Sequence, residues 1–347
     1  METAFQPLRE TVQTNCHIAD ARHASDYTMC IYLLKMREYF RWEQGYPYGA
    51  SLPGEAVGEW LMAREALWEG LEQRPYQDLV IGQARVPPFE SDRVNEFLLD
   101  QGLVYSGGLG HNHRPHFFLA DLERVETQDG YRILISGREH ARDLTAPPAM
   151  SQGTTIYVRR ESFRRMLWEK LEEWRWHKND NPMGRAIASY DFDHDLEQAL
   201  DQMTDNEVDV VVLHELGEVM AGRQLGSQWQ DMLSSLDRSR PEVMARAVRD
   251  HLADALSTLP ALLERRQAGS LHFYMANLNG MRHEIFPSLR AAYEHWRDTG
   301  QLGALEKLTS TARDHWLGLA EGLLELHRRH GPRAAPHMEA LIDRHHL

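Results

Sequence analysis

The sequence predicts a mainly α-helical protein, a multi-helix and bundle-like fold with one small antiparallel β-hairpin inserted into it. Three observations lead to this fold class. Apolar residues recur at three- and four-residue steps before residue 105 and again after residue 160. Most connections between these segments are short, which favours antiparallel neighbouring helices. Residues 106–160 show the patterns typical of strands and hairpins, so we expect three regions: 1–105, 106–160 and 161–347. The β-branched run Val210, Val211 and Val212 could also be a strand, but the caps and the length of its segment favour a helix.

The composition is that of a folded, acidic protein. Of the 347 residues, 42% are hydrophobic and 26% are charged, so large disordered regions are not expected. A total of 38 Lys and Arg against 52 Asp and Glu gives a net charge of −14, which disfavours nucleic acid and anionic membranes as partners. The sequence shows no signal-peptide pattern and no apolar run of roughly 18 residues, and we expect a cytoplasmic protein. It does not identify a small-molecule or protein partner.

Cysteine and histidine usage bears on redox state and metal binding. In a reducing compartment, the two cysteines, Cys16 and Cys30, are expected to be free thiols. The chain is rich in histidine, with 19 residues spread along its length. Abundant histidine raises the number of possible metal sites and the number of chance clusters alike.

One long core helix is expected over residues 16–44. Steps of three and four residues place Asp20, His23, Tyr27 and Cys30 on one face of such a helix. Asp20 and His23 are therefore candidate metal ligands. The alternative is a structural contact in which the histidine and the tyrosine satisfy Asp20 at a helix–helix interface.

The next segments alternate between turns and shorter helices. Residues 45–55 are rich in Gly and Pro and predict a connector, and Pro53 opens a helix that extends to about residue 73. The pair Pro87 and Pro88 belongs to an irregular stretch, and residues 91–101 predict a short helix.

The β-hairpin is predicted from its turn. Gln128, Asp129 and Gly130 separate two apolar segments, FFLADLERVET and YRILISG, as in a tight hairpin, and TTIYVRR at 154–160 can add a third strand. The glycine-rich segment 107–110 before them is interpreted as a flexible entry. His111, His113 and His140 flank the hairpin, and a metal site built from these three imidazoles is conceivable.

The central feature of the sequence is the segment VDVVVLHELGEVMAG, for which we predict a helix over residues 205–221. Thr204 and Glu207 fit a capping box at its start, and Gly222 fits a C-terminal stop. Apolar residues occur on every side of this helix, which is typical of a buried element.

Ionisable residues are clustered within the apolar part of that helix: His214, Glu215 and Glu218. Residues four apart lie on the same side of a helix, so His214 and Glu218 can be directed at one point. Buried charges need a cation, an Arg or Lys partner, or shared protons. One interpretation is a divalent Fe, Mn or Zn ion held by His214 and Glu218, with Glu215 as catalytic base. The other is a structural network with arginine.

A helix over 241–259 can complete either arrangement. Asp250, His251 and Asp254 lie on or beside its buried side, so His251 or Asp254 could face the central helix as further metal ligands. Arg282, in a segment at 270–287 that we expect to be irregular, is the candidate that could neutralise the acids without a metal.

The letters HELGE resemble the HELGH core of zincin metalloproteases. His214 matches the first zinc ligand of that motif, Glu215 its general base and Gly217 its glycine. Glu218 stands where the second histidine ligand belongs, so the resemblance is partial and leaves a protease in doubt.

The first helix, HELGE and the segment LHFYMANLNGMR together resemble a bacterial family of hypothetical proteins of unknown function. The resemblance extends over most of the chain. It implies no known activity, substrate or cofactor.

Two functional hypotheses follow, and whether the protein is an enzyme stays open. The first is a metal-dependent enzyme, a hydrolase or an oxygen-using one, with a His and carboxylate site between buried helices. The alternative is a non-catalytic helical scaffold or regulatory interaction protein, in which the buried polar network sets how helices align.

Overall fold

The computed structural model describes residues 2–110, 113–236 and 239–347, with side chains from residue 5 onward. Contacts divide the chain into two compact units, Met1–Glu169 with Asp191–Thr204, and Lys170–Tyr190 with Asp205–Leu347. Each unit is described by itself. Among the described residues, no helix combines the length and the apolar character needed to cross a membrane.

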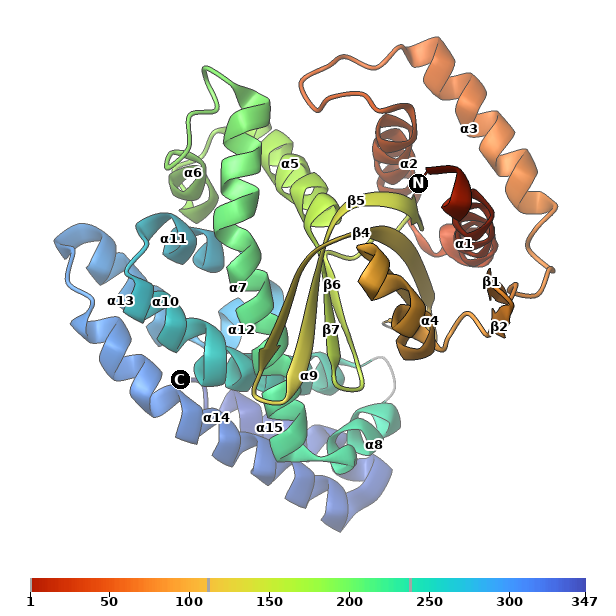
Figure 1. Ribbon diagram of the computed structural model, residues 1–347. Helices are drawn as coiled ribbons and strands as arrows, with labels where there is room; N and C mark the ends of the chain where they lie inside the picture. Colours follow the sequence, from red (N-terminus) through yellow and green to blue (C-terminus); the bar gives the residue numbers. More distant parts are fainter. Residues whose placement is uncertain (1, 111–112, 237–238) are drawn as a thin grey trace. The chain divides into compact units, whose positions relative to one another are not determined.

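The first unit contains a sheet and several helices (Figure 1). Its elements, in chain order, are α1 (Glu2–His23), η1 (Ala24–Asp26), α2 (Met29–Gln44), α3 (Gly54–Glu69), β1 (Leu79–Ile81), β2 (Ala84–Val86), α4 (Ser91–Leu98), η2 (Leu99–Gln101), β3 (Leu103–Leu109), β4 (Pro115–Gln128), β5 (Tyr131–Arg142), β6 (Ala149–Gln152), β7 (Thr155–Arg159), the beginning of α5 (Arg160–His177) and the beginning of α7 (Leu196–Leu225).

Every described element of the second unit is helical. These elements are the end of α5, α6 (Pro182–Ile187), most of α7 (Leu196–Leu225), α8 (Ser227–Ser235), α9 (Arg240–Ala253), the π-helical turn η4 (Asp254–Thr258), α10 (Leu259–Arg265), α11 (Ala268–Ala276), α12 (Gly280–Ile285), α13 (Pro287–Thr299), α14 (Gly303–His330), η5 (Gly331–Ala334) and α15 (Ala335–Asp343).

The predicted fold class, a mainly α-helical bundle with one small hairpin, is wrong. The first unit contains a curled, five-stranded mixed sheet with the order β3-β4-β5-β7-β6, and β1 and β2 form a further two-stranded sheet. All neighbouring strands are antiparallel except β5 and β7, which are parallel. The hairpin turn itself lies where it was predicted, between β4 and β5, with Asp129 and Gly130 at φ 52° and 83°.

Two glycines explain why the first strand of this sheet was missed. Gly107 and Gly108 lie within β3 and were interpreted as a flexible segment. A Cβ atom on Gly107 would lie 2.0 Å from the carbonyl oxygen of Pro88, and one on Gly108 would lie 1.5 Å from Nε2 of Gln152. These glycines therefore permit close packing over a strand, which is a tertiary requirement that local sequence does not reveal.

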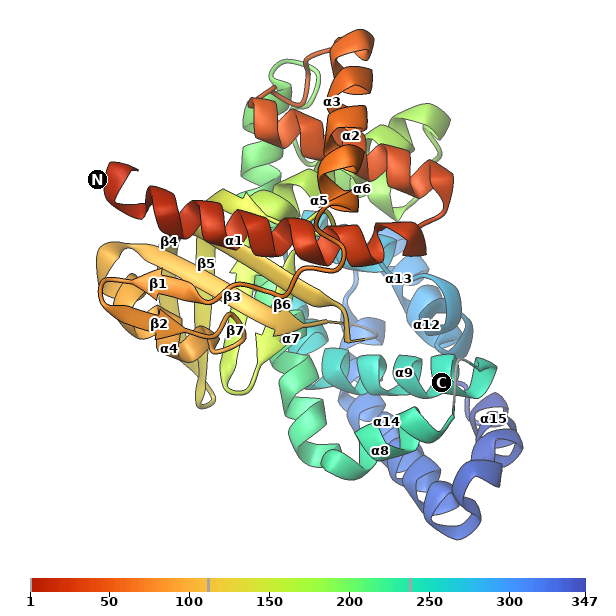
Figure 2. The ribbon, with the colours of Figure 1, turned by 90° about the vertical axis from the view of Figure 1, so that its right-hand side faces the viewer.

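Strand alternation gives the sheet two apolar faces. Figures 1 and 2 show α1 lying along one face, across β4 and β5. The core on that side consists of Leu8, Val12, Cys16, Ala19, Leu79, Val86, Val94, Leu98, Leu103, Tyr105, Phe117, Leu119 and Ala141. The residues between them face the other way and form a second cluster of Val104, Phe118, Ala120, Leu134, Met150 and Tyr157. Both cysteines are free thiols, as predicted, one of them buried and the other exposed.

The predicted single helix over 16–44 is interrupted. A 3₁₀ turn separates α1 from α2, and Arg114 lies at the interruption. Its guanidinium donates to the carbonyl oxygen of His23 at 3.1 Å, to Oδ2 of Asp26 at 2.6 Å and to the hydroxyl of Tyr27 at 2.7 Å. A residue distant in sequence thus satisfies the polar groups that the broken helix exposes. The proposed stripe of metal ligands on one helix face does not form.

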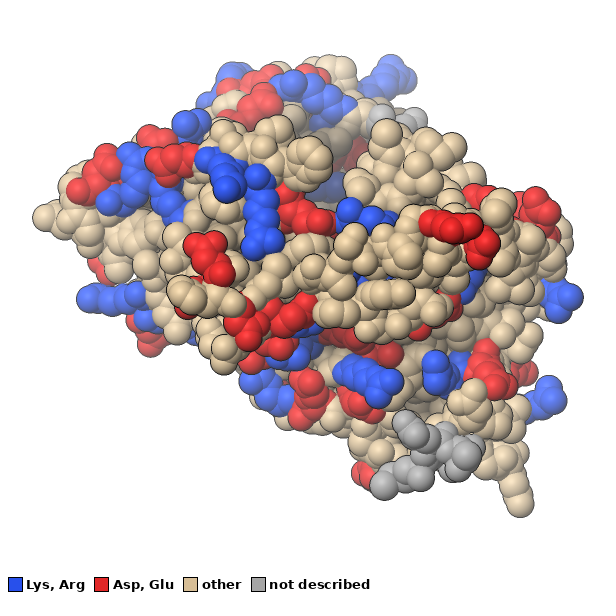
Figure 3. All heavy atoms as spheres, turned by 90° about the horizontal axis from the view of Figure 1, so that it is seen from above, with Lys and Arg blue, Asp and Glu red and all other residues tan. Residues whose placement is uncertain are grey.

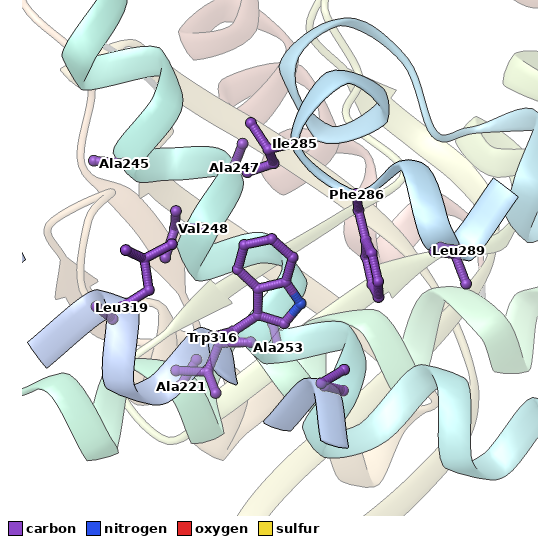
Figure 4. Close-up of a cluster of buried hydrophobic side chains, with 14 of the residues drawn as sticks. Ala221, Ala245, Ala247, Val248, Ala253, Ile285, Phe286, Leu289, Trp316 and Leu319 are labelled. Atoms are coloured by element: carbon purple, nitrogen blue, oxygen red, sulfur yellow. The ribbon is translucent and has the colours of Figure 1, made fainter. Parts of the chain in front are cut away.

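The core of the second unit surrounds Trp316 of α14 (Figure 4). Its indole is fully buried beside Val248 and Ala253 of α9 and beside Phe286 and Leu289. This packing holds α9, which carries the acidic residues of the candidate site, against its neighbours.

The central helix is longer than predicted. Thr204 lies inside α7 and its Oγ1 donates to the carbonyl oxygen of Leu200 at 2.6 Å, so the predicted capping box is wrong. The helix passes through Gly222 and ends at Leu225. The segment 270–287, which we expected to be irregular, is largely helical and contains α12 and most of α11.

Charged side chains are dispersed on the surface. Figure 3 shows acidic and basic residues interspersed over the face that it draws. On that face, the net charge of −14 is not gathered into one acidic area.

We predict that Arg114→Gln lowers the free energy of unfolding by about 1–2 kcal/mol, because the half-buried acceptors of His23 and Tyr27 lose a charged donor. Urea unfolding of the full chain measures this change. The matched control is Arg93→Gln, which removes an exposed pair with Glu90 and should change stability by less than about 0.5 kcal/mol. Equal stabilities of the two variants would contradict the role given to Arg114.

Candidate functional site

A close helix contact brings the ionisable residues of the second unit together. A Cβ atom on Gly217 would lie only 2.3 Å from the carbonyl oxygen of Ala253, so the backbones of α7 and α9 touch at this point. Only glycine allows such an approach. The contact places His214, one turn before Gly217, beside Asp254, which follows Ala253.

Asp254 is the buried centre of the network. Its side chain is fully buried and accepts hydrogen bonds from the Tyr274 hydroxyl at 2.9 Å and from the Arg282 guanidinium. Its Oδ1 lies 3.3 Å from Nδ1 of His214. Burial alone would raise the pKa of Asp254, but the Arg282 charge and the hydrogen bond and charge of His214 together outweigh burial and hold the pKa well below its usual range. The carboxylate is therefore ionised, and both of its oxygens are engaged.

The backbone at Asp254 departs from the α-helix. The turn Asp254–Thr258 is π-helical and is followed by Pro260 in α10. Proline lacks the N–H group needed for the helical pattern, and its ring clashes with the carbonyl four residues earlier, so a regular α-helix cannot continue here. Single π-turns of this kind are frequent at functional sites.

His214 presents one ring nitrogen to the network and the other to its accessible side. Nδ1 faces Asp254, whereas Nε2 lies 3.9 Å from Oε1 of Glu218, and the side chain is 34% exposed. Burial lowers the pKa of His214, but the hydrogen bond and charge of Asp254 outweigh it and raise the pKa to about 9. The imidazole is thus protonated at neutral pH, and its Nε2–H can be donated to a molecule bound outside.

Two further acids share this environment. Burial raises the pKa of Glu215 to about 7 and that of Asp250 to about 6. Near neutral pH the Glu215 carboxyl exists in both forms, whereas His214 one residue away is charged. This is a pair of neighbouring groups with separated pKa values, as general acid–base chemistry requires.

Arg249 is a member of the site that the sequence interpretation missed. Its Nη2 donates to Oε2 of Glu218 at 2.8 Å and to the carbonyl oxygen of the same residue at 3.3 Å. The available sequence signal was weak. Buried acids need cationic partners, and Arg249 directly precedes the acid Asp250 in the sequence. Only the packing of α9 shows that Arg249 contacts Glu218. Tyr274 was missed as well, because an apolar segment gave no reason to single out its hydroxyl.

Three candidate metal ligands do not join His214. Nε2 of His251 lies 2.8 Å from the carbonyl oxygen of Arg282, and the His251 ring stacks on the Trp316 ring with 4.8 Å between the ring centroids. His251 is therefore a core residue, and burial lowers its pKa to about 4. Asp20 and His23 belong to the first unit. Asp20 accepts from the Leu144 amide at 2.9 Å.

His23 contacts an acid other than Asp20. Its Nδ1 lies 3.4 Å from Oδ2 of Asp26. Within residues 2–110, 113–236 and 239–347, no three His, Cys, Asp or Glu side chains are arranged to hold a metal ion.

The predicted metal site of His111, His113 and His140 is only partly within the described residues. His111 lies outside the residues that the structure describes. Nε2 of His140 lies 2.7 Å from Oδ1 of Asp121 on β4.

Two family models together match most of the chain. The N-terminal domain of a family of unknown function, DUF6866, matches residues 7–159, and the C-terminal domain of the same family matches residues 164–345. The chain belongs to the DUF6866 family. The His214 network lies in its C-terminal domain and the sheet in its N-terminal domain. No curated protein and no solved structure matches the chain.

These matches bear on the two resemblances seen in the sequence. A family of unknown function is confirmed, and it supplies no activity. The likeness of HELGE to the zincin core has no support in the matches, and Gly217 of that motif has the structural role of allowing α7 to touch α9.

We predict that Gly217→Ala lowers the free energy of unfolding by about 1–3 kcal/mol, because the new methyl group overlaps the α9 backbone and forces the helices apart. The matched control is Gly222→Ala on the same helix, where a Cβ atom meets nothing within 4 Å. That change should stabilise the protein by up to about 1 kcal/mol, since alanine favours a helix over glycine. Thermal and urea unfolding of both variants measure the difference, and a neutral Gly217→Ala would refute the close contact.

We further predict that the His214 imidazole titrates near pH 9 and that Asp254→Asn lowers its pKa. Because the folded pKa lies above the ordinary value of 6.5, the interaction stabilises the protein fully below pH 6.5 and is lost as pH rises through 9. Histidine side-chain NMR measures the titration, with circular dichroism to verify folding.

Asp298→Asn on α13 is the control, and it should leave the His214 titration unchanged. Should Asp254→Asn fail to fold, Glu218→Gln removes a second acid beside His214 and should lower the same pKa by a smaller amount. A His214 signal that titrates at its ordinary pH in the wild type would refute the assignment.

Proposed function

We propose that this protein is a hydrolase whose acid–base site is formed by His214 and Glu215. The observation that carries the proposal is the orientation of His214 by the buried carboxylate of Asp254, with Nδ1 on the acid and Nε2 on the accessible side. A histidine fixed in this way by an aspartate has the geometry of a general acid or base.

The two groups have complementary roles in hydrolysis. Glu215, with a pKa of about 7, can accept a proton from an attacking water molecule. His214, with a pKa of about 9, can donate its Nε2 proton to the leaving group. Arg249 and Arg282 offset the negative charge of Glu218 and Asp254, so the site does not become strongly negative. The expected substrate is a small polar molecule whose leaving group needs a proton.

A divalent metal, Fe, Mn or Zn, is a second candidate for the same site. The observation in its favour is the i, i+4 spacing of His214 with Glu218 on α7 and of Asp250 on α9 with Asp254 at the start of η4. Arg282 already bonds Asp254, so a metal bound there would have to compete with that guanidinium. Elemental analysis of untagged protein tests this candidate. Near-stoichiometric metal that His214→Ala removes would support it, and substoichiometric metal after supplementation would refute it.

We predict that His214→Gln and Glu215→Gln each lower kcat/KM about 100-fold or more on a substrate found with a panel of fluorogenic esters, phosphates, glycosides and amides. The wild-type rate should rise as Glu215 ionises near pH 7 and fall as His214 loses its proton near pH 9. Glu215→Gln should remove the acidic limb of this profile. His295→Gln, at an exposed position on α13, should keep wild-type activity.

The scaffold alternative gives the opposite results. If the network only aligns helices, the double variant His214→Leu, Glu218→Gln should stay folded and should be at least as stable as the wild type. That result, together with no hydrolysis of any substrate class by the wild type, would refute the enzymatic proposal.

A further inference from the structure

The first unit contains a cavity of about 350 Å³ between the beginning of α1 and one face of the sheet. A volume of this size lies within the range of roughly 300–1,000 Å³ that is usual for small-molecule sites. The cavity is lined by Phe5, Gln6, Arg9, Gln101, Gly102, Leu103, Leu119, Asp121, Arg138 and His140. Apart from Phe5 and Gln6, its lining residues lie in the match to the N-terminal DUF6866 domain, and none of them belongs to the His214 network.

Three strands form the floor of this cavity. Leu119 and Asp121 are two residues apart on β4 and therefore share a face, and Leu103 of β3 pairs with Asp121. Arg138 and His140 share a face of β5 for the same reason. The contact of 2.7 Å between His140 and Asp121 shows that these residues lie on the same side of the sheet.

The first turns of α1 form the opposite wall. Phe5 contributes an aromatic ring and Arg9 a guanidinium. The Nε of Arg9 donates to the carbonyl oxygen of His140 at 3.0 Å, which fixes the side chain over the sheet. A guanidinium held through Nε keeps its two terminal nitrogens available as paired donors.

The charge of this cavity differs from that of the chain as a whole. Among residues 2–110, 113–236 and 239–347, no carboxylate forms an ion pair with Arg9 or Arg138. Asp121 is the acid that lines the cavity, and it is engaged by His140. Two arginines without ion-pair partners therefore face a half-apolar cavity in a protein of net charge −14.

We propose that this cavity binds a small organic anion. Arg9 and Arg138 would hold its carboxylate or phosphate group, because guanidinium groups match the geometry of such oxyanions. The apolar part of the ligand would lie against Phe5, Leu103 and Leu119. The proposal does not depend on the function proposed for His214.

Isothermal titration calorimetry of the full chain tests the proposal with phenyl phosphate, phenylacetate and inorganic phosphate. We expect saturable one-to-one binding of at least one of the two aromatic anions, and the stronger of the two identifies the oxyanion. Inorganic phosphate should bind more weakly, since it leaves the apolar wall uncovered. Higher ionic strength should weaken binding, because two exposed cations contribute.

Substitutions at the two arginines localise the binding. Arg138→Gln and Arg9→Gln should each raise Kd at least about tenfold, because each removes a charged donor. Arg132→Gln is the matched control on the same strand, since Arg132 pairs with Asp92 outside the cavity, and it should leave Kd unchanged.

Three outcomes would overturn the proposal: no binding of either aromatic anion at millimolar concentration, equal affinity for inorganic phosphate and phenyl phosphate, or an unchanged Kd in Arg138→Gln. Arg138 is exposed, so this variant is expected to fold even if Arg9→Gln does not. Circular dichroism of each variant verifies folding.

Discussion

The contact between the backbones of α7 and α9 at Gly217 is the constraint on which the second unit's polar site depends. Helices with ordinary side chains at their crossing keep their axes about 8–10 Å apart. Gly217 at the crossing allows a closer approach, because the carbonyl oxygen of Ala253 on α9 lies only 2.3 Å from the position that a Cβ atom of residue 217 would occupy. His214 and Asp254 lie immediately beside this crossing. The distance of 3.3 Å between Nδ1 of His214 and Oδ1 of Asp254 is therefore a direct result of the crossing.

Once these helices touch, a single buried carboxylate organises the charges around it. An ionised acid in a fully buried position is costly unless strong donors surround it. Asp254 has three such partners, Tyr274, Arg282 and His214, and of these His214 is the one that loses a proton near pH 9. The ionised acid keeps His214 charged, whereas burial keeps Glu215 partly protonated. One helix crossing therefore produces both members of an acid–base pair.

Local sequence patterns predicted the structure correctly where it depends on residues close in the sequence. They failed where contacts between distant residues determine the structure. The turn at Asp129 and Gly130 was predicted correctly, because the backbone of a tight hairpin turn demands such residues at that point. The strands β4, β5 and β7 were anticipated, but the extent of the sheet was missed, since β3 carries Gly107 for a contact with Pro88 and does not show a strand's usual composition. The same reason explains the interruption between α1 and α2, which depends on Arg114 reaching across from another part of the chain.

The sequence by itself determined the location of the central helix, the shared face of His214 and Glu218 on it, and the two free thiols, because helical spacing and residue chemistry are local properties. It also indicated a family of unknown function, which the family models confirm. Only the tertiary structure decided that Asp254 faces His214 while His251 packs into the core. His251 and Asp254 are three positions apart, and the sequence places both of them on or beside the buried side of one helix. Which of the two faces His214 depends on how that helix is rotated about its axis. Packing against other helices sets this rotation, and no local sequence pattern reveals it.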